Sequence, residues 1–228
     1  MGELVTFTSN GGTAEGYLAE PESGAGPAVI VIQEWWGLVG HIMSVVDRFA
    51  AEGFLALAPD LFHGARTREP DEAEKLMLGM EIDPAGRDIA GAATYLAGLA
   101  ANSGRGTGCV GFSMGGSLAL WSATLSEEIV AAVGFYPAVP WGRINPAWAH
   151  YVGKHAMLHA DEAAGGCEAQ YLQTAITSIE QAGGEVACFD YPGTKHGFFN
   201  DDRPEVYHET AAREAWSRTL NLFRAKLS

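Results

Sequence analysis

Two continuous apolar runs with a helical stretch between them constrain the fold of this chain most strongly. The runs PAVIVIQEWWG (27–37) and FLALAPDLF (54–62) do not alternate with polar residues, which is typical of strands buried on both faces of a parallel sheet. Between them, residues 42–52 carry apolar side chains at helical spacing, and Gly53 follows as a stop signal. The segment predicts a strand–helix–strand unit, which builds parallel sheets through right-handed crossovers.

The same alternation continues along the chain. The first residues read as two alternating strands joined by Asn10-Gly11-Gly12, a hairpin signal. We found no internal repeat or linker, so residues 1–228 are expected to form a single α/β domain with a doubly wound, mostly parallel sheet. Further strands are expected at 108–112, 129–137, 154–160 and 185–191, and further helices at 70–80, 85–101, 115–125, 167–183 and 204–226.

Charge and hydropathy exclude several classes of partner. The net charge is −14 at pH 7, which disfavours binding to a phosphate backbone. No apolar run approaches the ~18 residues that suggest a membrane span, and the N-terminus lacks the features of a signal peptide. We therefore expect a cytoplasmic protein with no nucleic-acid or membrane partner, present as a monomer or weak dimer.

The three cysteines are Cys109, Cys167 and Cys188. An odd number without close spacing indicates neither a disulfide framework nor a zinc site. Cys109 and Cys188 fall in strand-like runs, where a small apolar residue fits. The sequence thus predicts reduced thiols in an intracellular protein and no bound metal.

The segment CVGFSMGG (109–116) holds the candidate nucleophile. Ser113 stands between an apolar strand and an amphipathic helix, within the pattern Gly111-x-Ser113-x-Gly115. Such a turn projects the hydroxyl from the end of a sheet and needs glycines, because side chains two residues away would collide with it. An inert serine in a packing loop is the alternative. An overlapping dinucleotide-like pattern begins at Gly106, before the strand rather than after it, so we expect no cofactor.

A serine hydroxyl needs a base, and the base needs an acid to orient it. Asp161 follows the strand KHAMLHA, and His196 follows the strand EVACFDY, so the order is serine, acid, histidine. Asp161 could instead cap the next helix, and Glu162 is adjacent. His155 and His159 are four residues apart, but on a strand that spacing does not make a metal-ligand pair.

Four segments together resemble the dienelactone hydrolase family, also called carboxymethylenebutenolidases: QEWWGL (33–38), APDLF (58–62), GFSMGG (111–116) and HGFFNDDRP (196–204). The resemblance extends over nearly the whole length. It implies an α/β-hydrolase fold without a large cap domain, and a carboxylic ester hydrolase without a cofactor that acts on small esters or lactones.

The resemblance also implies roles for individual residues. Ser113, Asp161 and His196 take the triad positions, and Glu34 matches a glutamate that contacts the resting nucleophile. A solvated strand-end residue is the alternative for Glu34. Backbone N–H groups of Trp35 and Met114 would form the oxyanion hole.

Substrate recognition is the second implication. Family members hold a substrate carboxylate with arginines, for which Arg66, Arg68 and Arg203 are candidates. For Arg203 a surface ion pair with Asp201 or Asp202 is the alternative. Trp36 offers a flat apolar wall for a cyclic substrate.

The chain departs from the family at the nucleophile, where the family has cysteine and this chain has Ser113. A thiol can be ionised in advance, whereas a serine must lose its proton to His196 during attack. A serine esterase and a Cys→Ser replacement that disables the site both fit the sequence. An acyl transferase on the same triad and a binding protein of the same fold are the further alternatives.

Overall fold

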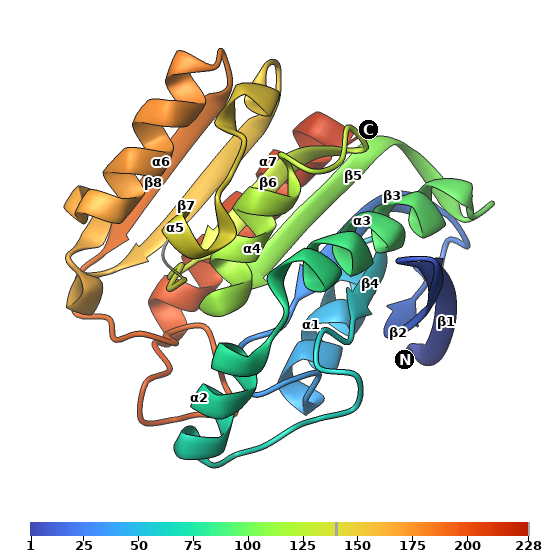
Figure 1. Cartoon of the computed structure of the whole chain (residues 1–228), viewed down its shortest axis with the longest axis horizontal. Helices are drawn as coiled ribbons and strands as arrows, with labels where there is room; N and C mark the ends of the chain where they lie inside the picture. The colour runs from blue at the N-terminus through green and yellow to red at the C-terminus, as the bar shows by residue number, and fades with distance from the viewer. Residues whose placement is uncertain (140, 228) are drawn as a thin grey trace.

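The computed structural model describes residues 1–139 and 141–227 of the chain, and within them eight strands form one sheet (Figure 1). Their order across the sheet is β1-β2-β4-β3-β5-β6-β7-β8. β2 runs antiparallel to β1 and β4, and all other neighbours are parallel. The strands are β1 (Glu3–Ser9), β2 (Gly12–Ala19), β3 (Gly26–Ile32), β4 (Leu55–Pro59), β5 (Asn102–Phe112), β6 (Ile129–Phe135), β7 (His155–Asp161) and β8 (Glu185–Tyr191).

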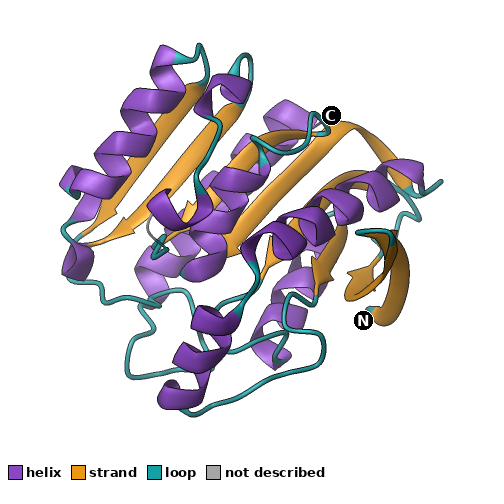
Figure 2. Cartoon of the chain, in the orientation of Figure 1, coloured by secondary structure: helices purple, strands orange, loops and turns teal. Residues whose placement is uncertain are grey.

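Helices cover both faces of the sheet (Figure 2), as the strand–helix alternation predicts. Buried side chains of α1 and α7 form one apolar cluster with the sheet, and those of α3, α4 and α6 form the other. The helices are α1 (Gly40–Ala51), α2 (Pro70–Gly79), α3 (Ile82–Gly98), α4 (Met114–Ser122), α5 (Trp141–Ile144), α6 (Gln170–Gln181) and α7 (Glu209–Leu227), with 3₁₀ turns η1 (Trp148–Tyr151), η2 (Glu162–Ala164) and η3 (Gly166–Glu168). This confirms the expected doubly wound α/β-hydrolase fold.

Strand β3 shows why its sequence is apolar without alternation. Ile30 and Ile32 pack into the cluster of α3 and α4, whereas Val29 and Val31 pack into the cluster of α1 and α7. All four side chains are fully buried. Because helices cover both faces of the sheet, the side chains on both faces of the strand must be apolar.

Some boundaries differ from the sequence expectation. α7 begins at Glu209 rather than at 204, because residues 196–208 form successive turns, such as the one in which Val206 N–H donates to Arg203 O. Likewise α6 begins at Gln170, after two 3₁₀ turns. The short α5 and η1 were not predicted, because four-residue elements show no periodicity.

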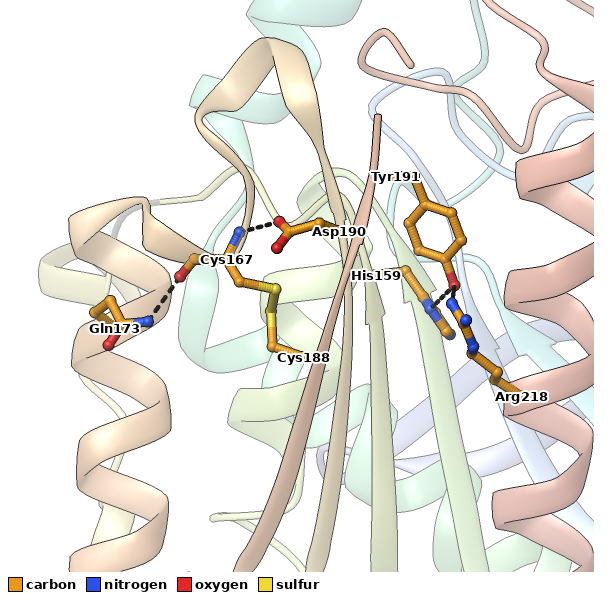
Figure 3. Close-up of a disulfide and its surroundings, with 7 residues drawn as sticks. All are labelled: His159, Cys167, Gln173, Cys188, Asp190, Tyr191 and Arg218. Atoms are coloured by element: carbon orange, nitrogen blue, oxygen red, sulfur yellow. Dashed lines mark hydrogen bonds between the residues drawn. A yellow bond between two sulfur atoms is a disulfide. The ribbon is translucent and has the colours of Figure 1, made fainter. Parts of the chain in front are cut away.

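The expectation of reduced thiols is wrong for Cys167 and Cys188, whereas that of a small buried residue is confirmed for Cys109. Cys167 and Cys188 form a disulfide, with Cα atoms 6.0 Å apart (Figure 3). Cys109 is the free cysteine and is fully buried. The two bonded residues lie 21 positions apart in sequence, on the turn after β7 and in the middle of β8, so only the pairing of β7 with β8 brings them together.

Two further features of the described residues bear on function. None of their helices is long and apolar enough to cross a membrane. In the same part of the chain, no group of three or more histidine, cysteine or acidic side chains is arranged to hold a metal ion.

The carboxyl ends of the parallel strands all lie at the same end of the sheet. Glu34 follows β3, Ser113 follows β5, Tyr136 follows β6, Asp161 ends β7, and His196 lies on the loop after β8. Open α/β sheets bind their ligands at the carboxyl ends of the strands. The topology therefore gathers there four residues that the sequence singled out, together with Tyr136, which the sequence did not indicate.

Candidate active site

Ser113 occupies the strained turn that its sequence pattern predicts. Its φ is 54° and its ψ is −117°, a left-handed conformation that is uncommon for a residue with a side chain. A Cβ on Gly111 would lie 1.9 Å from the Gly115 carbonyl oxygen, and one on Gly115 would lie 2.4 Å from the Gln33 oxygen. Both glycines are thus required by backbone atoms packed against them.

Ser113, His196 and Asp161 form a continuous hydrogen-bonded chain. The Ser113 Oγ lies 2.7 Å from His196 Nε2, and His196 Nδ1 lies 3.3 Å from Asp161 Oδ2. An ionised carboxylate only accepts, so Nδ1 carries the proton and Nε2 accepts from the serine hydroxyl. In this tautomer the histidine is arranged to take the proton of Ser113.

Burial differs sharply along this chain of contacts. The Asp161 side chain is 1% exposed, whereas that of His196 is 45% exposed. The second oxygen of Asp161 accepts from the Ala164 N–H at 2.7 Å and caps the turn η2. Both interpretations of Asp161 from the sequence therefore apply, because one oxygen caps the turn and the other faces the histidine.

Glu34 is a buried carboxylate, 4% exposed, with two partners that the sequence analysis missed. Asn200 Nδ2 donates to its Oε2 at 2.7 Å, and the Tyr136 hydroxyl donates to its Oε1 at 3.4 Å. Among the described residues, the side-chain hydrogen bonds of Glu34 go to these two groups and not to Ser113. Asn200 lies in the segment HGFFNDDRP, but nothing in its spacing indicated that it would reach Glu34.

Tyr136 connects this carboxylate to the base. Its ring packs edge-on against that of His196, with ring centres 5.0 Å apart. Burial raises the pKa of its phenol well above the ordinary value, and the charge of Glu34 raises it further. Tyr136 therefore stays protonated and acts as a hydrogen-bond donor beside the histidine.

The expected oxyanion-hole donors are the backbone N–H groups of Trp35 and Met114. Met114 is the first residue of α4, so its N–H is one of those without an acceptor inside the helix. Trp35 lies in the turn directly after β3, in which Gly37 N–H donates to Glu34 O. The close approach of Gly115 to the Gln33 carbonyl brings the start of α4 against the end of β3.

A cavity of about 400 Å³ lies beside these residues. Trp36, Arg68, Asn200 and Arg203 line it, together with other side chains, and neither Ser113 nor His196 is among them. Asn200, which lines it, donates to Glu34 with its side-chain amide. Arg66 instead lines a neighbouring groove, with Arg68.

Arg203 has a different ion-pair partner from those considered in the sequence. Its guanidinium lies 2.8 Å from the Glu205 carboxylate and 5.3 Å from the centre of the Trp36 ring. Asp201 pairs instead with His41 and Arg48. Partial burial alone would raise the pKa of Asp201, but its bonds to Arg48 and His41 outweigh that effect and lower it.

Comparison with known proteins decides the family. Residues 14–227 match the dienelactone hydrolase family over nearly the full length. The chain belongs to the dienelactone hydrolase family. This confirms the resemblance seen in the sequence and makes the protein a carboxylic ester hydrolase, one that acts on esters or lactones.

Two relatives and one solved structure illustrate the match. A protein of Aquifex aeolicus with the provisional name carboxymethylenebutenolidase is 33% identical, with both chains fully covered. Protein usf of Aquifex pyrophilus is 32% identical, again over both full chains. The structure of a dienelactone hydrolase-like promiscuous phosphotriesterase from metagenomic libraries shares the fold, with a TM-score of 0.81, 21% identity, and coverage of 100% of this chain and 99% of the other.

Proposed function

We propose that this dienelactone hydrolase family member cleaves small esters or lactones through a covalent acyl-enzyme on Ser113. The hydrogen-bonded chain from Ser113 through His196 to Asp161 carries the proposal. The imidazole nitrogen of His196, 2.7 Å from the Ser113 hydroxyl, is a base within reach of its proton.

The steps follow from the geometry. Ser113 Oγ attacks the substrate carbonyl while His196 Nε2 takes its proton, and Asp161 stabilises the imidazolium that forms. The backbone N–H groups of Trp35 and Met114 would stabilise the oxyanion. His196 then returns the proton to the leaving alkoxide, and a water activated in the same way releases the acid. No step needs a metal or a cofactor.

Glu34 has a supporting role in this scheme. Its carboxylate is held by Asn200 and Tyr136, and Tyr136 packs on His196. We therefore assign Glu34 to the electrostatic environment of the base. In the family, the matching glutamate contacts the resting nucleophile. With a serine nucleophile, we propose that Glu34 acts on the base instead.

Substrates that carry a carboxylate fit the neighbouring cavity. Arg68 and Arg203 line it beside the ring of Trp36, so it offers positive charge next to a flat apolar wall. Arg203 would exchange its exposed partner Glu205 for the substrate, at small cost because exposed pairs contribute little stability.

The test is a burst assay with a short-chain p-nitrophenyl ester on the natural chain, Ser113→Ala and Ser113→Cys. Turnover that is lost in Ser113→Ala supports the serine mechanism. Activity that appears only in Ser113→Cys would show that the serine disables a thiol site. Transfer of the acyl group to an added alcohol in preference to water would favour the acyl transferase. No turnover in any of the three would favour a binding protein.

A further inference from the structure

β8, the strand that precedes the loop of His196, is an edge strand of the sheet. Within the described part of the chain, β8 pairs with β7 alone, and most of its side chains are partly or fully exposed. His196 lies on the loop beyond Tyr191, the last residue of β8. Edge strands and loops open more readily than central strands, so the position of this base needs support from outside the ladder of hydrogen bonds.

Three contacts meet at Cys167 on the neighbouring turn (Figure 3). Its sulfur is bonded to Cys188 on β8, its N–H donates to Asp190 Oδ1 at 2.6 Å, and its carbonyl accepts from Gln173 Nε2 at 2.8 Å. Gly166 is in close contact as well, since a Cβ there would lie 2.3 Å from Asp190 Oδ1. The turn η3 is therefore fastened to β8 and to α6 together.

The turn η2, which precedes η3 in the chain, begins at the acid. Asp161 ends β7, and its Oδ1 caps the turn η2, which leads through Gly165 into Cys167. On the other side, Glu162 Oε2 accepts from Gly193 N–H at 2.7 Å. The loop of the acid is thus joined to β8 by the disulfide and to the loop of the base by Glu162.

We propose that the Cys167–Cys188 disulfide positions Asp161 against His196, so that the oxidised chain turns over substrate faster than the reduced chain. The proposal rests on the proposed function. Cys167 and Cys188 are positioning residues, because their sulfur atoms act through the turn and strand that carry the acid and the base. The buried Cys109 takes no part, since burial raises the pKa of its thiol to about 12 and leaves it unreactive.

The chemistry of the switch is ordinary thiol–disulfide exchange. A dithiol reductant attacks one sulfur as a thiolate, the bond between Cys167 and Cys188 breaks, and the second thiol of the reagent closes its own disulfide. Two electrons and two protons pass from the reagent to the two cysteines. Cytosolic thiols reduce most disulfides, so the state of this bond would depend on the compartment.

The first measurement is a thiol count on the denatured chain without reductant. One reactive thiol, that of Cys109, is expected. A count of three would overturn the proposal, because no bond would exist to position anything.

The second measurement compares kcat and KM for a p-nitrophenyl ester before and after treatment with dithiothreitol, well below the melting temperature. We expect kcat to fall about tenfold, since small displacements of catalytic groups are costly, while KM stays within about twofold. Labelling of Ser113 by a fluorophosphonate should slow in parallel, and reoxidation should restore both rates. A bond that acts only on stability would lower the melting temperature and leave kcat unchanged, which would overturn the proposal.

Matched variants separate the bond from other effects of the reagent. Cys167→Ser/Cys188→Ser should show the lowered kcat with and without dithiothreitol, whereas Cys109→Ala should respond to it as the natural chain does. A further loss in the double variant upon reduction would contradict the proposal. If the oxidised chain neither turns over the ester nor labels, the proposed function fails first; if both states are equally active, only this inference fails.

Discussion

Ser113 follows β5 in the middle of the sheet, whereas Asp161 ends β7 and His196 follows β8 at its edge. β5 has a strand on each side and helices on both faces. The turn at Ser113 is defined by backbone atoms, since the glycines around it touch carbonyl groups of α4 and β3. Side chains contribute little to its geometry.

At the edge of the sheet, side chains rather than backbone atoms define the geometry. Side chains fasten the loops of Asp161 and His196: Ala164 N–H donates to Asp161, Gly193 N–H donates to Glu162, and the disulfide joins the loop of the acid to β8. We therefore expect a change in the backbone of the central turn to destabilise the whole fold. At the edge, the loss of a single side-chain contact should lower activity or stability separately. Four variants test this difference.

The largest effect is expected for Gly111→Ala. The added Cβ would lie 1.9 Å from the Gly115 carbonyl, so the turn and the start of α4 must move. We expect a loss of more than about 4 kcal/mol in unfolding free energy, measured by urea denaturation. The edge control is Gly193→Ala, where φ is +78° but no atom lies within 4 Å, so the cost should be about 1–2 kcal/mol. Equal losses at the two sites would remove the contrast between centre and edge.

Asp161→Asn should separate activity from stability at the edge. The amide can still accept from the Ala164 N–H but presents N–H₂ to His196, which favours the wrong tautomer. We expect kcat to fall on the order of 10⁴-fold while the urea midpoint changes little. The measurement is steady-state kinetics beside urea unfolding, with Glu162→Gln as the neighbouring control. Unchanged kcat would exclude Asp161 as the acid.

Beneath the edge, His159 should make stability depend on pH. Its Nδ1 lies 2.9 Å from the Tyr191 hydroxyl and its Nε2 lies 3.0 Å from Thr219 Oγ1. Arg218 donates to Tyr191, which leaves that hydroxyl to donate to Nδ1, so the ring is neutral (Figure 3). Burial, aided by the charge of Arg218, lowers the pKa of His159 to about 3.

The sign follows from proton uptake. As pH falls from about 6.5 to about 3, the unfolded chain binds a proton at His159 and the folded chain does not, so stability falls by at most about 1.4 kcal/mol per pH unit. Above pH 6.5 this contribution is fully present. The melting temperature of His159→Gln should depend less on pH in this window than that of the natural chain. Parallel pH profiles would contradict the neutral histidine.

The smallest effect is expected where the two regions meet. Asn200, on the loop of the base, donates to Glu34 at the end of β3, next to the central strand. Asn200→Ala leaves a buried carboxylate oxygen without this donor, at a cost of about 1–3 kcal/mol in unfolding free energy. Thermal unfolding of Asn200→Ala beside exposed Asp202→Ala would measure it. Equal stability of the two variants would mean that Glu34 is satisfied in another way.

Much of the fold and the site could be predicted from local patterns. The apolar run of β3 indicated a strand covered on both faces, and its alternating residues do pack into two separate clusters. Gly111 and Gly115 indicated a turn that admits no Cβ. These features were readable because each depends on residues close in sequence.

Other features were decided only by the tertiary structure. The bond between Cys167 and Cys188 and the hydrogen bond from Asn200 to Glu34 depend on which turns and side chains meet after the sheet has formed. No periodicity encodes such meetings, because polar side chains on loops are not constrained by the spacing that buries apolar ones. The sequence by itself determined the strands, the helices and the order of serine, acid and histidine; the packing of the loops at the edge decided how the acid and the base are held.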